Sequence, residues 1–283
     1  MFNRKISVFY PLHFRYKTDN LNPSTKKMID FKIENGVGII TLNRPDKFHS
    51  FVREMALALQ EKLDECANNK AIRTIYLTSS GKAFCAGQDL SEAIDPEQSD
   101  LETIIEEHYN PIIQRIRNIE KPVVCGVNGV AAGAGASLAL ACDITIAAKS
   151  AAFIQAFSKI GLIPDSGGTF YLPRLIGLQK AAALMFLGDA VPAEEAEKMG
   201  MIYKAVDDET FQEVALGVAQ KLAKMPTKGI GLTKRLLNES FTNTLTQQLE
   251  REKEVQIEAA DTADFKEGVD AFLAKRKPMF KGE

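Results

Sequence analysis

The sequence predicts an α/β fold with a helical C-terminal region, and three features support this prediction. Short apolar runs rich in β-branched residues alternate with stretches of helical periodicity as far as about residue 226. Two glycine-spaced turns between residues 122 and 169 each open onto a helical run. Beyond Pro226 only helical patterns remain. We therefore expect an α/β body followed by an all-helical segment.

The body is expected to begin with a hairpin and a helix. Ile29–Leu42 holds two apolar-rich segments on either side of Asn35-Gly36, a dipeptide typical of hairpin turns. Ser50 is placed to cap a helix over residues 51–67, where apolar residues recur at helical spacing. A further strand is expected over residues 73–78, since this run is rich in β-branched and aromatic residues.

An acidic, polar stretch follows over residues 92–106. We expect it to form a mobile surface loop, or simply a solvated one, that leads into a helix over residues 109–119. The apolar face of that helix is predicted to contain Ile112, Ile113 and Ile116.

The central stretch runs from Pro122 to Thr169. Its run Val123–Val127 is typical of a buried strand, and the small residues Gly133–Ala136 open a helix-forming run. A helix N-terminus carries unpaired N–H groups, and small residues let a ligand oxygen approach them. This arrangement suits an oxyanion hole. It is equally typical of tight packing between a helix and a strand, and the small residues alone favour packing.

Asp165 is the only carboxylate of the second turn, between an apolar run and Gly167-Gly168. Apolar surroundings raise the pKa of a carboxyl group, which suits a general acid or base. An Asp that precedes a helix is also a common N-cap. The spacing alone leaves both interpretations open.

The rest of the chain is expected to be mostly helical. Helices are predicted over 179–187, 193–199 and 211–224, with a short strand over 202–206, and beyond Pro226 over 232–239, 244–260 and 263–275. We therefore divide the chain into an N-terminal extension (1–28), an α/β core (29–226) and a C-terminal helical region (227–283).

Composition excludes several classes of protein. The net charge of −2 over 283 residues argues against a nucleic-acid-binding protein. No apolar run approaches the roughly 20 residues that span a bilayer. The 4 cysteines form no CxxC pair and the 3 histidines form no metal-ligand pattern, so we expect reduced thiols, a cytoplasmic location and no metal.

Residues 1–28 are basic and aromatic, with no acidic residue before Asp19. A mitochondrial transit peptide is one interpretation. Because the stretch is poor in the Ala, Leu and Ser of such peptides, we favour an upstream start codon with Met28 as the natural start. We expect the extension to be loosely ordered.

Four segments together resemble the crotonase, or enoyl-CoA hydratase/isomerase, superfamily: Ile40–Pro45, Ala83–Leu90, Lys121–Asp143 and Leu162–Thr169. The resemblance implies a crotonase-like spiral of ββα units whose C-terminal helices build a homotrimer or a dimer of trimers. It also implies an acyl-CoA thioester as substrate and no cofactor, since coenzyme A is part of the substrate.

The resemblance also assigns roles to residues. The backbone N–H groups of Gln88 and Ala134 would form the oxyanion hole. Coenzyme A would lie along Ala86, Gly87, Asp89 and Leu90, with basic groups at Lys47 and Lys275.

The carboxylates separate the reactions of this superfamily. Its hydratases hold water between two glutamates, and the matching positions here are Ser137 and Phe157. Asp165 instead matches the single aspartate of isomerases that act in phenylacetate degradation and expand an aromatic-derived epoxide to an oxepin. We therefore expect an acyl-CoA isomerase with Asp165 as its acid/base, and with enoyl-CoA double-bond shifting as a second activity.

Other functions stay open at this point. One is a hydratase, a thioesterase or another enzyme of the same fold, and another is a non-enzymatic acyl-CoA-binding homologue. His49 stands where the family usually has Asn. We expect it to alter loop hydrogen bonds and not to be catalytic, and we expect His108 to be a pocket wall or surface residue.

Overall fold

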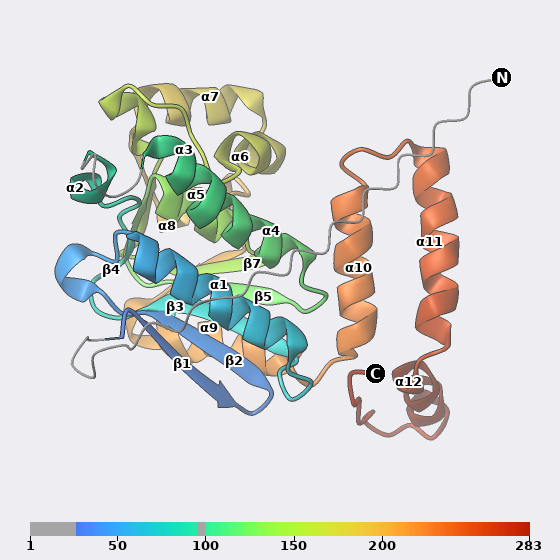
Figure 1. The fold of residues 1–283 in the computed structure, drawn as a ribbon. Helices are drawn as coiled ribbons and strands as arrows, with labels where there is room; N and C mark the ends of the chain where they lie inside the picture. The colour runs from blue at the N-terminus through green and yellow to red at the C-terminus, as the bar shows by residue number, and fades with distance from the viewer. Residues whose placement is uncertain (1–26, 95–99) are drawn as a thin grey trace.

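The computed structural model describes residues 27–94 and 100–283, and its architecture is built on two sheets (Figure 1). The main sheet has the order β1-β2-β3-β5-β7-β10, in which only the β1–β2 pair is antiparallel. A smaller sheet has the order β4-β6-β8-β9, in which only the β8–β9 pair is antiparallel. The strands are β1 Ile29–Glu34, β2 Val37–Leu42, β3 Thr74–Ser79, β4 Ala83–Cys85, β5 Val123–Val127, β6 Val130–Ala132, β7 Ile144–Ala148, β8 Ala152–Ile154, β9 Ala190–Pro192 and β10 Lys204–Val206.

The two sheets are linked by a repeated pattern of strand, short strand and helix. In each unit the longer strand joins the main sheet and the short strand joins the smaller one: β3 with β4, β5 with β6, and β7 with β8. A helical segment follows each pair. The predicted spiral of ββα units is therefore confirmed. The helices are α1 Arg53–Asn68, α2 Leu90–Ala93, α3 Leu101–Thr103, α4 Asn110–Asn118, α5 Ala134–Ala141, α6 Gly168–Ile176, α7 Leu178–Leu187, α8 Ala193–Lys198, α9 Asp208–Leu222, α10 Thr227–Glu239, α11 Leu245–Ala260 and α12 Ala263–Leu273, with 3₁₀ turns at Pro45–Lys47 and Ala156–Ile160 and a π-helical segment at Ile104–Tyr109.

The central strands of the main sheet are buried on both faces, as parallel strands usually are, whereas the edge strand β1 is largely exposed. Alternate residues of β3 show this: Tyr76 packs in the layer formed with α9, while Ile75 and Leu77 belong to the larger core beneath α1 and α4. The larger core continues to α5, so the predicted site is built on a tightly packed layer.

The first predicted helix begins later than expected, and Ser50 does not cap it. The helix starts at Arg53, and its N-cap residue, Val52, makes no side-chain capping hydrogen bond. Phe51 instead forms an isolated parallel bridge with Gln88. The Ser50 hydroxyl accepts a hydrogen bond from Arg44 (3.0 Å). Pairing with a distant segment therefore overrides the local capping signal.

The acidic stretch 92–106 is largely helical where it is described, which corrects the predicted loop. It contains α3 and the start of the π-helical segment that leads into α4. Glu92 ends up buried, so solvation does not explain it. The prediction for residues 95–99 lies outside the described residues, as does nearly all of the prediction for 1–28.

The C-terminal helices α10–α12 stand apart from the α/β body in Figure 1. Pro226 directly precedes α10, at the predicted boundary. The buried Lys234 fastens α10 to the body, since its ammonium group contacts Asp143 (2.8 Å) and the carbonyl oxygen of Ile116 (2.6 Å). Among the described residues, no helix is long and apolar enough to cross a membrane. All four cysteines are free and buried.

Candidate active site

The two segments expected to form the oxyanion hole lie against each other. Gly87 has a φ of +90°, and a Cβ added there would lie 3.1 Å from the carbonyl oxygen of Ala132 and 3.4 Å from the nitrogen of Ala134. Only glycine permits this approach. The end of the β4 segment is thereby brought beside the first turn of α5.

Ala134 is the first residue of α5, so its N–H has no partner within the helix. Gln88 is fixed through its neighbours: the Phe51 N–H donates to the Gly87 oxygen (2.7 Å) and the Asp89 N–H donates to the Phe51 oxygen (2.9 Å). The Gln88 N–H therefore points away from Phe51. Within residues 27–94 and 100–283, neither the Gln88 nor the Ala134 N–H donates a hydrogen bond. Both are available to an oxyanion.

Asp165 lies in the turn that opens α6, but it is not the N-cap. The N-cap is Gly167, and no side chain caps the helix. The Asp165 carboxylate accepts a hydrogen bond from the Ser166 hydroxyl (2.9 Å). Burial raises the pKa of Asp165, and the bond from Ser166 opposes this effect in part. The carboxylate therefore does not cap α6, and its role as an acid/base stays a prediction.

The Asp165 turn packs on the same helix that supplies the Ala134 N–H. A Cβ added at Gly168 would lie 2.7 Å from the hydroxyl oxygen of Ser137, in the first turns of α5. A Cβ added at Gly167 would lie 3.8 Å from a methyl of Ile113 in α4. The turn that carries Asp165 therefore packs against both the first turns of α5 and α4.

The two positions that carry glutamates in hydratases are occupied differently here. Ser137 is fully buried, and its hydroxyl has no partner in the described chain. The Phe157 ring is also buried, 3.8 Å from a Cβ added at Gly133. An apolar ring and a hydroxyl thus replace two carboxylates. The buried Gln155, which sequence reasoning missed, also lies near Gly168 with its amide unpartnered among described groups.

His49 has a structural role, as expected. Its Nδ1 accepts a hydrogen bond from the Arg44 N–H (2.9 Å), so its Nε2 carries the proton and donates to the Ser80 oxygen (2.6 Å). The ring is fully buried, and burial lowers its pKa. This neutral imidazole joins two loops and is not free to exchange protons.

His108 is a buried residue and not a surface residue. It lies in the π-helical segment, and neither ring nitrogen has a partner among the described residues. Burial lowers its pKa. The next residue, Tyr109, donates from its hydroxyl to the Gln88 side chain (2.9 Å), a contact that the sequence did not reveal.

The residues expected to bind coenzyme A are only partly brought together. Ala86 and Leu90 are exposed beside Gln88, and Lys47 is exposed on the neighbouring 3₁₀ turn. Asp89 is committed to an ion pair with Arg44 (2.8 Å) and caps α2. Lys275 follows α12, on the opposite side of the molecule from α2 in Figure 1, so one chain does not bring it to this site.

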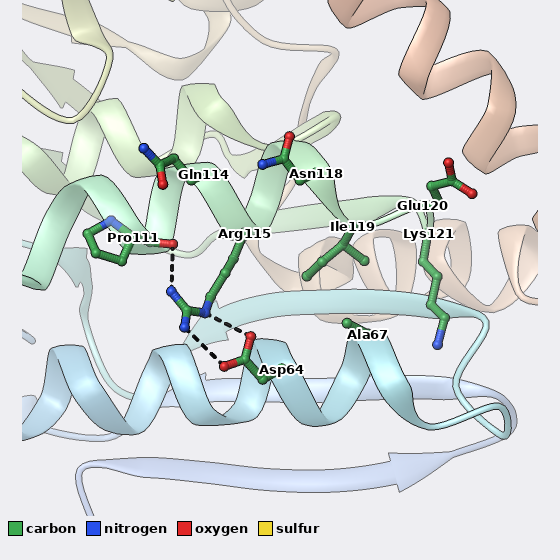
Figure 2. Close-up of a pocket in the computed structure, with 9 residues that line it drawn as sticks. All are labelled: Asp64, Ala67, Pro111, Gln114, Arg115, Asn118, Ile119, Glu120 and Lys121. Carbon is green, nitrogen blue, oxygen red and sulfur yellow. Dashed lines mark hydrogen bonds and ion pairs between the residues drawn. The ribbon is translucent and has the colours of Figure 1, made fainter. Parts of the chain in front are cut away.

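A separate groove between α1 and α4 contains none of the predicted site residues (Figure 2). Its volume is about 430 Å³, and its charged floor is the pair of Arg115 with Asp64 (2.8 Å). The other charged groups of the lining also have partners: Glu120 pairs with Lys228 (3.0 Å), and Lys121 donates to the Cys66 oxygen (2.6 Å). The candidate active site is therefore the region where Gln88, Ala134 and Asp165 meet.

Comparison with known proteins agrees with this geometry. Residues 32–283 match the family model described as enoyl-CoA hydratase/isomerase. An Escherichia coli (strain K12) protein named 1,2-epoxyphenylacetyl-CoA isomerase is 50% identical over 254 residues, which are 89% of this chain and 97% of the relative. A Rhodobacter capsulatus protein named "Probable enoyl-CoA hydratase" is 44% identical, over 90% of this chain and 98% of the relative.

Solved structures show the same likeness. The crystal structure of an enoyl-CoA hydratase from Bacillus anthracis superposes with a TM-score of 0.85 at 32% identity, covering 91% of this chain and 100% of that chain. The fold, the motifs and these relatives agree: the chain belongs to the enoyl-CoA hydratase/isomerase family, the crotonase superfamily.

Proposed function

We propose that this protein is an acyl-CoA isomerase that works through a thioester enolate. Its proposed main reaction is the ring expansion of 1,2-epoxyphenylacetyl-CoA to an oxepin-CoA, with enoyl-CoA double-bond isomerisation as a second activity. The observation that carries the proposal is a single half-buried carboxylate, Asp165, beside α5, where Ser137 and Phe157 leave no carboxylate pair. The 50% identity to an isomerase of that name supports the choice of substrate.

The proposed chemistry needs few groups. The thioester oxygen accepts hydrogen bonds from the backbone N–H groups of Gln88 and Ala134, and each such donor contributes roughly 3 kcal/mol to comparable reactions. In the ring expansion, the bond between the two epoxide carbons breaks and the π electrons of the ring shift, so that the oxygen becomes part of a seven-membered ring. Asp165 removes a proton from the carbon next to the thioester and returns it at another carbon of the acyl group, so the product has the mass of the substrate. Its raised pKa brings proton uptake and release closer to neutral pH.

Changing Asp165 to Asn tests this assignment. The amide cannot accept the proton, so turnover should vanish while binding of the CoA thioester stays nearly intact. Both proteins are incubated with a small panel of acyl-CoA thioesters that includes the epoxide. An isomerised product appears in liquid chromatography with mass detection as a new peak with the mass of the substrate, and calorimetry measures binding. Activity near that of the wild type in the variant would rule out Asp165 as the base.

Hydration is the second candidate, because relatives named as hydratases match the chain. Crotonyl-CoA distinguishes the two: a product that gains one water indicates a hydratase, and a shifted double bond at unchanged mass indicates an isomerase. Binding of an acyl-CoA would raise the midpoint of thermal unfolding. If binding is seen in this way but no member of the panel is converted, the protein is a non-enzymatic homologue.

A further inference from the structure

Tyr109 holds an unusual position at the candidate site. It is the last residue of the π-helical segment Ile104–Tyr109, a conformation that is often found at functional sites. Its ring is buried and packs edge-on against Phe51, with centroids 5.7 Å apart. Its hydroxyl donates to the side-chain oxygen of Gln88 at 2.9 Å. The phenol is thus directed at the residue whose backbone N–H is assigned to the oxyanion hole.

The hydrogen bond from Tyr109 is the first of a chain. The Gln88 side-chain nitrogen donates to one carboxylate oxygen of Glu92 (2.9 Å). The other carboxylate oxygen of Glu92 accepts a hydrogen bond from the N–H of Arg53, which is the first residue of α1 (2.9 Å). Glu92 is buried, so both bonds lie in surroundings of low dielectric, where they are stronger than in water. The Gln88 side chain is therefore clamped on both sides.

Tyr109 is followed directly by α4, which packs against the turn that carries Asp165. Ile113 lies one helical turn beyond it and packs at the Gly167 position, 3.8 Å from a Cβ built there. Burial raises the pKa of Tyr109 well above its ordinary value, and nearby negative groups, Asp165 among them, raise it further. The phenol is therefore a neutral donor at any physiological pH.

We propose that Tyr109 is a positioning residue for the reaction: its hydroxyl, through the chain Tyr109–Gln88–Glu92, holds the Gln88 peptide in the orientation that receives the thioester oxygen. This inference rests on the proposed function, since it takes the Gln88 N–H as an oxyanion donor. A misplaced donor loses much of its effect, because an error of about 1 Å at a catalytic group can cost about a hundredfold in rate.

Tyr109→Phe tests the proposal, because it removes the hydroxyl and keeps the packed ring. We expect kcat on an isomerised acyl-CoA to fall between about tenfold and a hundredfold, with little change in KM. The matched control is Tyr76→Phe. Tyr76 is also buried, but it lies in the layer beside α9 and not beside Gln88. This control should keep the kcat of the wild type.

A spectroscopic measurement separates positioning from packing. Bound phenylacetyl-CoA, which lacks the epoxide, should show a thioester carbonyl stretch lowered by the two N–H donors in the wild type. Tyr109→Phe should return this stretch toward its value in solution, and Tyr76→Phe should not. If Tyr109→Phe fails to fold, Glu92→Gln breaks the chain at its other end and should show the same pair of effects.

The outcomes keep the two proposals apart. If the wild type isomerises no acyl-CoA, the proposed function fails, while the carbonyl stretch still reports on Tyr109. If the wild type is active but Tyr109→Phe, or Glu92→Gln in its place, keeps both its kcat and its carbonyl frequency, the positioning role of Tyr109 is overturned.

Discussion

Ser166 and Gly167, the two residues after Asp165, both have left-handed backbone conformations, with φ of 52° and 75°. This conformation is uncommon for a residue such as Ser and is found most often where function requires it. The turn directs the Asp165 carboxylate into a half-buried position that raises its pKa. The charged form of a carboxyl group held in this way lowers the free energy of unfolding, whether or not a substrate is bound.

Asp165→Asn should make the protein more stable near neutral pH. The folded pKa of Asp165 lies above the ordinary value of 3.8, so its proton is bound more tightly in the folded state than in the unfolded one. The stability that this proton contributes is complete below the unfolded pKa and is lost as pH rises through the folded pKa. The stability of the Asn variant does not change with this titration, so its advantage should grow as the pH rises above about 3.8 and become constant above the folded pKa of Asp165.

Urea unfolding of both proteins at several pH values measures this difference in the free energy of unfolding. If the Asn variant is more stable by the same amount at every pH, the amide improves packing and the pKa of the Asp165 carboxyl is not raised. A less stable variant at pH 7 would show that the Ser166 hydrogen bond outweighs burial.

Gly135 illustrates how little space separates the two oxyanion segments. A Cβ added there would lie 2.4 Å from the carbonyl oxygen of Cys85, which is backbone and cannot move aside cheaply. Gly135→Ala should therefore cost about 1–3 kcal/mol or more, although Ala favours helices. Gly217→Ala in α9 is the matched control: nothing lies within 4 Å of its Cβ position, so it should gain about 0.5–1 kcal/mol. Thermal unfolding of the two variants checks both signs, and equal stabilities would contradict the close approach.

For single residues, the sequence indicates the candidate acid/base and the candidate oxyanion donors, but it does not indicate the residues that hold them in place. Asp165, Gln88 and Ala134 stand in motifs that can be recognised from residue order alone. The bond between Glu92 and the Arg53 N–H spans 39 positions, and Glu92 looks like any carboxylate of an acidic loop until the fold buries it. Such contacts leave no periodic signal, so sequence reasoning could not find Tyr109 and Glu92 as partners of Gln88.

Among the secondary-structure elements, α1 shows how a distant residue replaces a local cap. Its first N–H is satisfied by Glu92 and not by Ser50, because Phe51 is drawn into pairing with Gln88. Helix ends are set by such tertiary contacts, and for this reason the predicted helix began two residues early. The 3-residue strands β4, β6, β8 and β9 were missed because they are too short for alternation to appear.

Lys234 makes the attachment of α10 testable. Lys234→Met removes a buried ion pair with Asp143 and leaves the carbonyl oxygen of Ile116 without this partner. Since Asp143 keeps Arg117 (3.0 Å), we expect a loss near the lower end of the usual range, about 3 kcal/mol. Hydrogen exchange should accelerate in α10 and its neighbour α11 more than in α9.

The control for this variant is Lys253→Met, whose lysine is 59% exposed in α11 and pairs with Glu250 on the surface. Exposed ion pairs contribute little, so exchange and stability should hardly change. If the two variants behaved alike, the buried ammonium group would not be what fastens α10 to the body.

For the molecule as a whole, the resemblance predicted more than periodicity did. Alternating strands and helices indicate an α/β body, but they do not say that each long strand and its short successor join different sheets. The resemblance predicted a spiral of ββα units, which was confirmed, and the division of the strands between two sheets became visible only in the structure. The oligomer that the motifs also imply has no counterpart in a single chain, so it stays a prediction.

The C-terminal region gives this prediction a physical basis. Phe272 and Leu273 on α12 are 82% and 74% exposed, and Phe265 and Val269 of the same helix are also exposed. A lone chain rarely leaves such a cluster of large apolar side chains in water. We therefore expect the wild type to assemble as a homotrimer or a dimer of trimers through these helices, which would also place Lys275 near another protomer.

Phe272→Glu combined with Leu273→Glu should prevent this assembly, because two charges would have to be buried without partners. Sedimentation velocity should give a trimer or hexamer of the 31.1 kDa chain for the wild type and a smaller species for the variant. Ile33→Glu is the control: Ile33 is 43% exposed on β1, away from the helical region, and its variant should sediment like the wild type. A wild type that sediments as a monomer would mean that these apolar side chains are covered by something other than a copy of this chain.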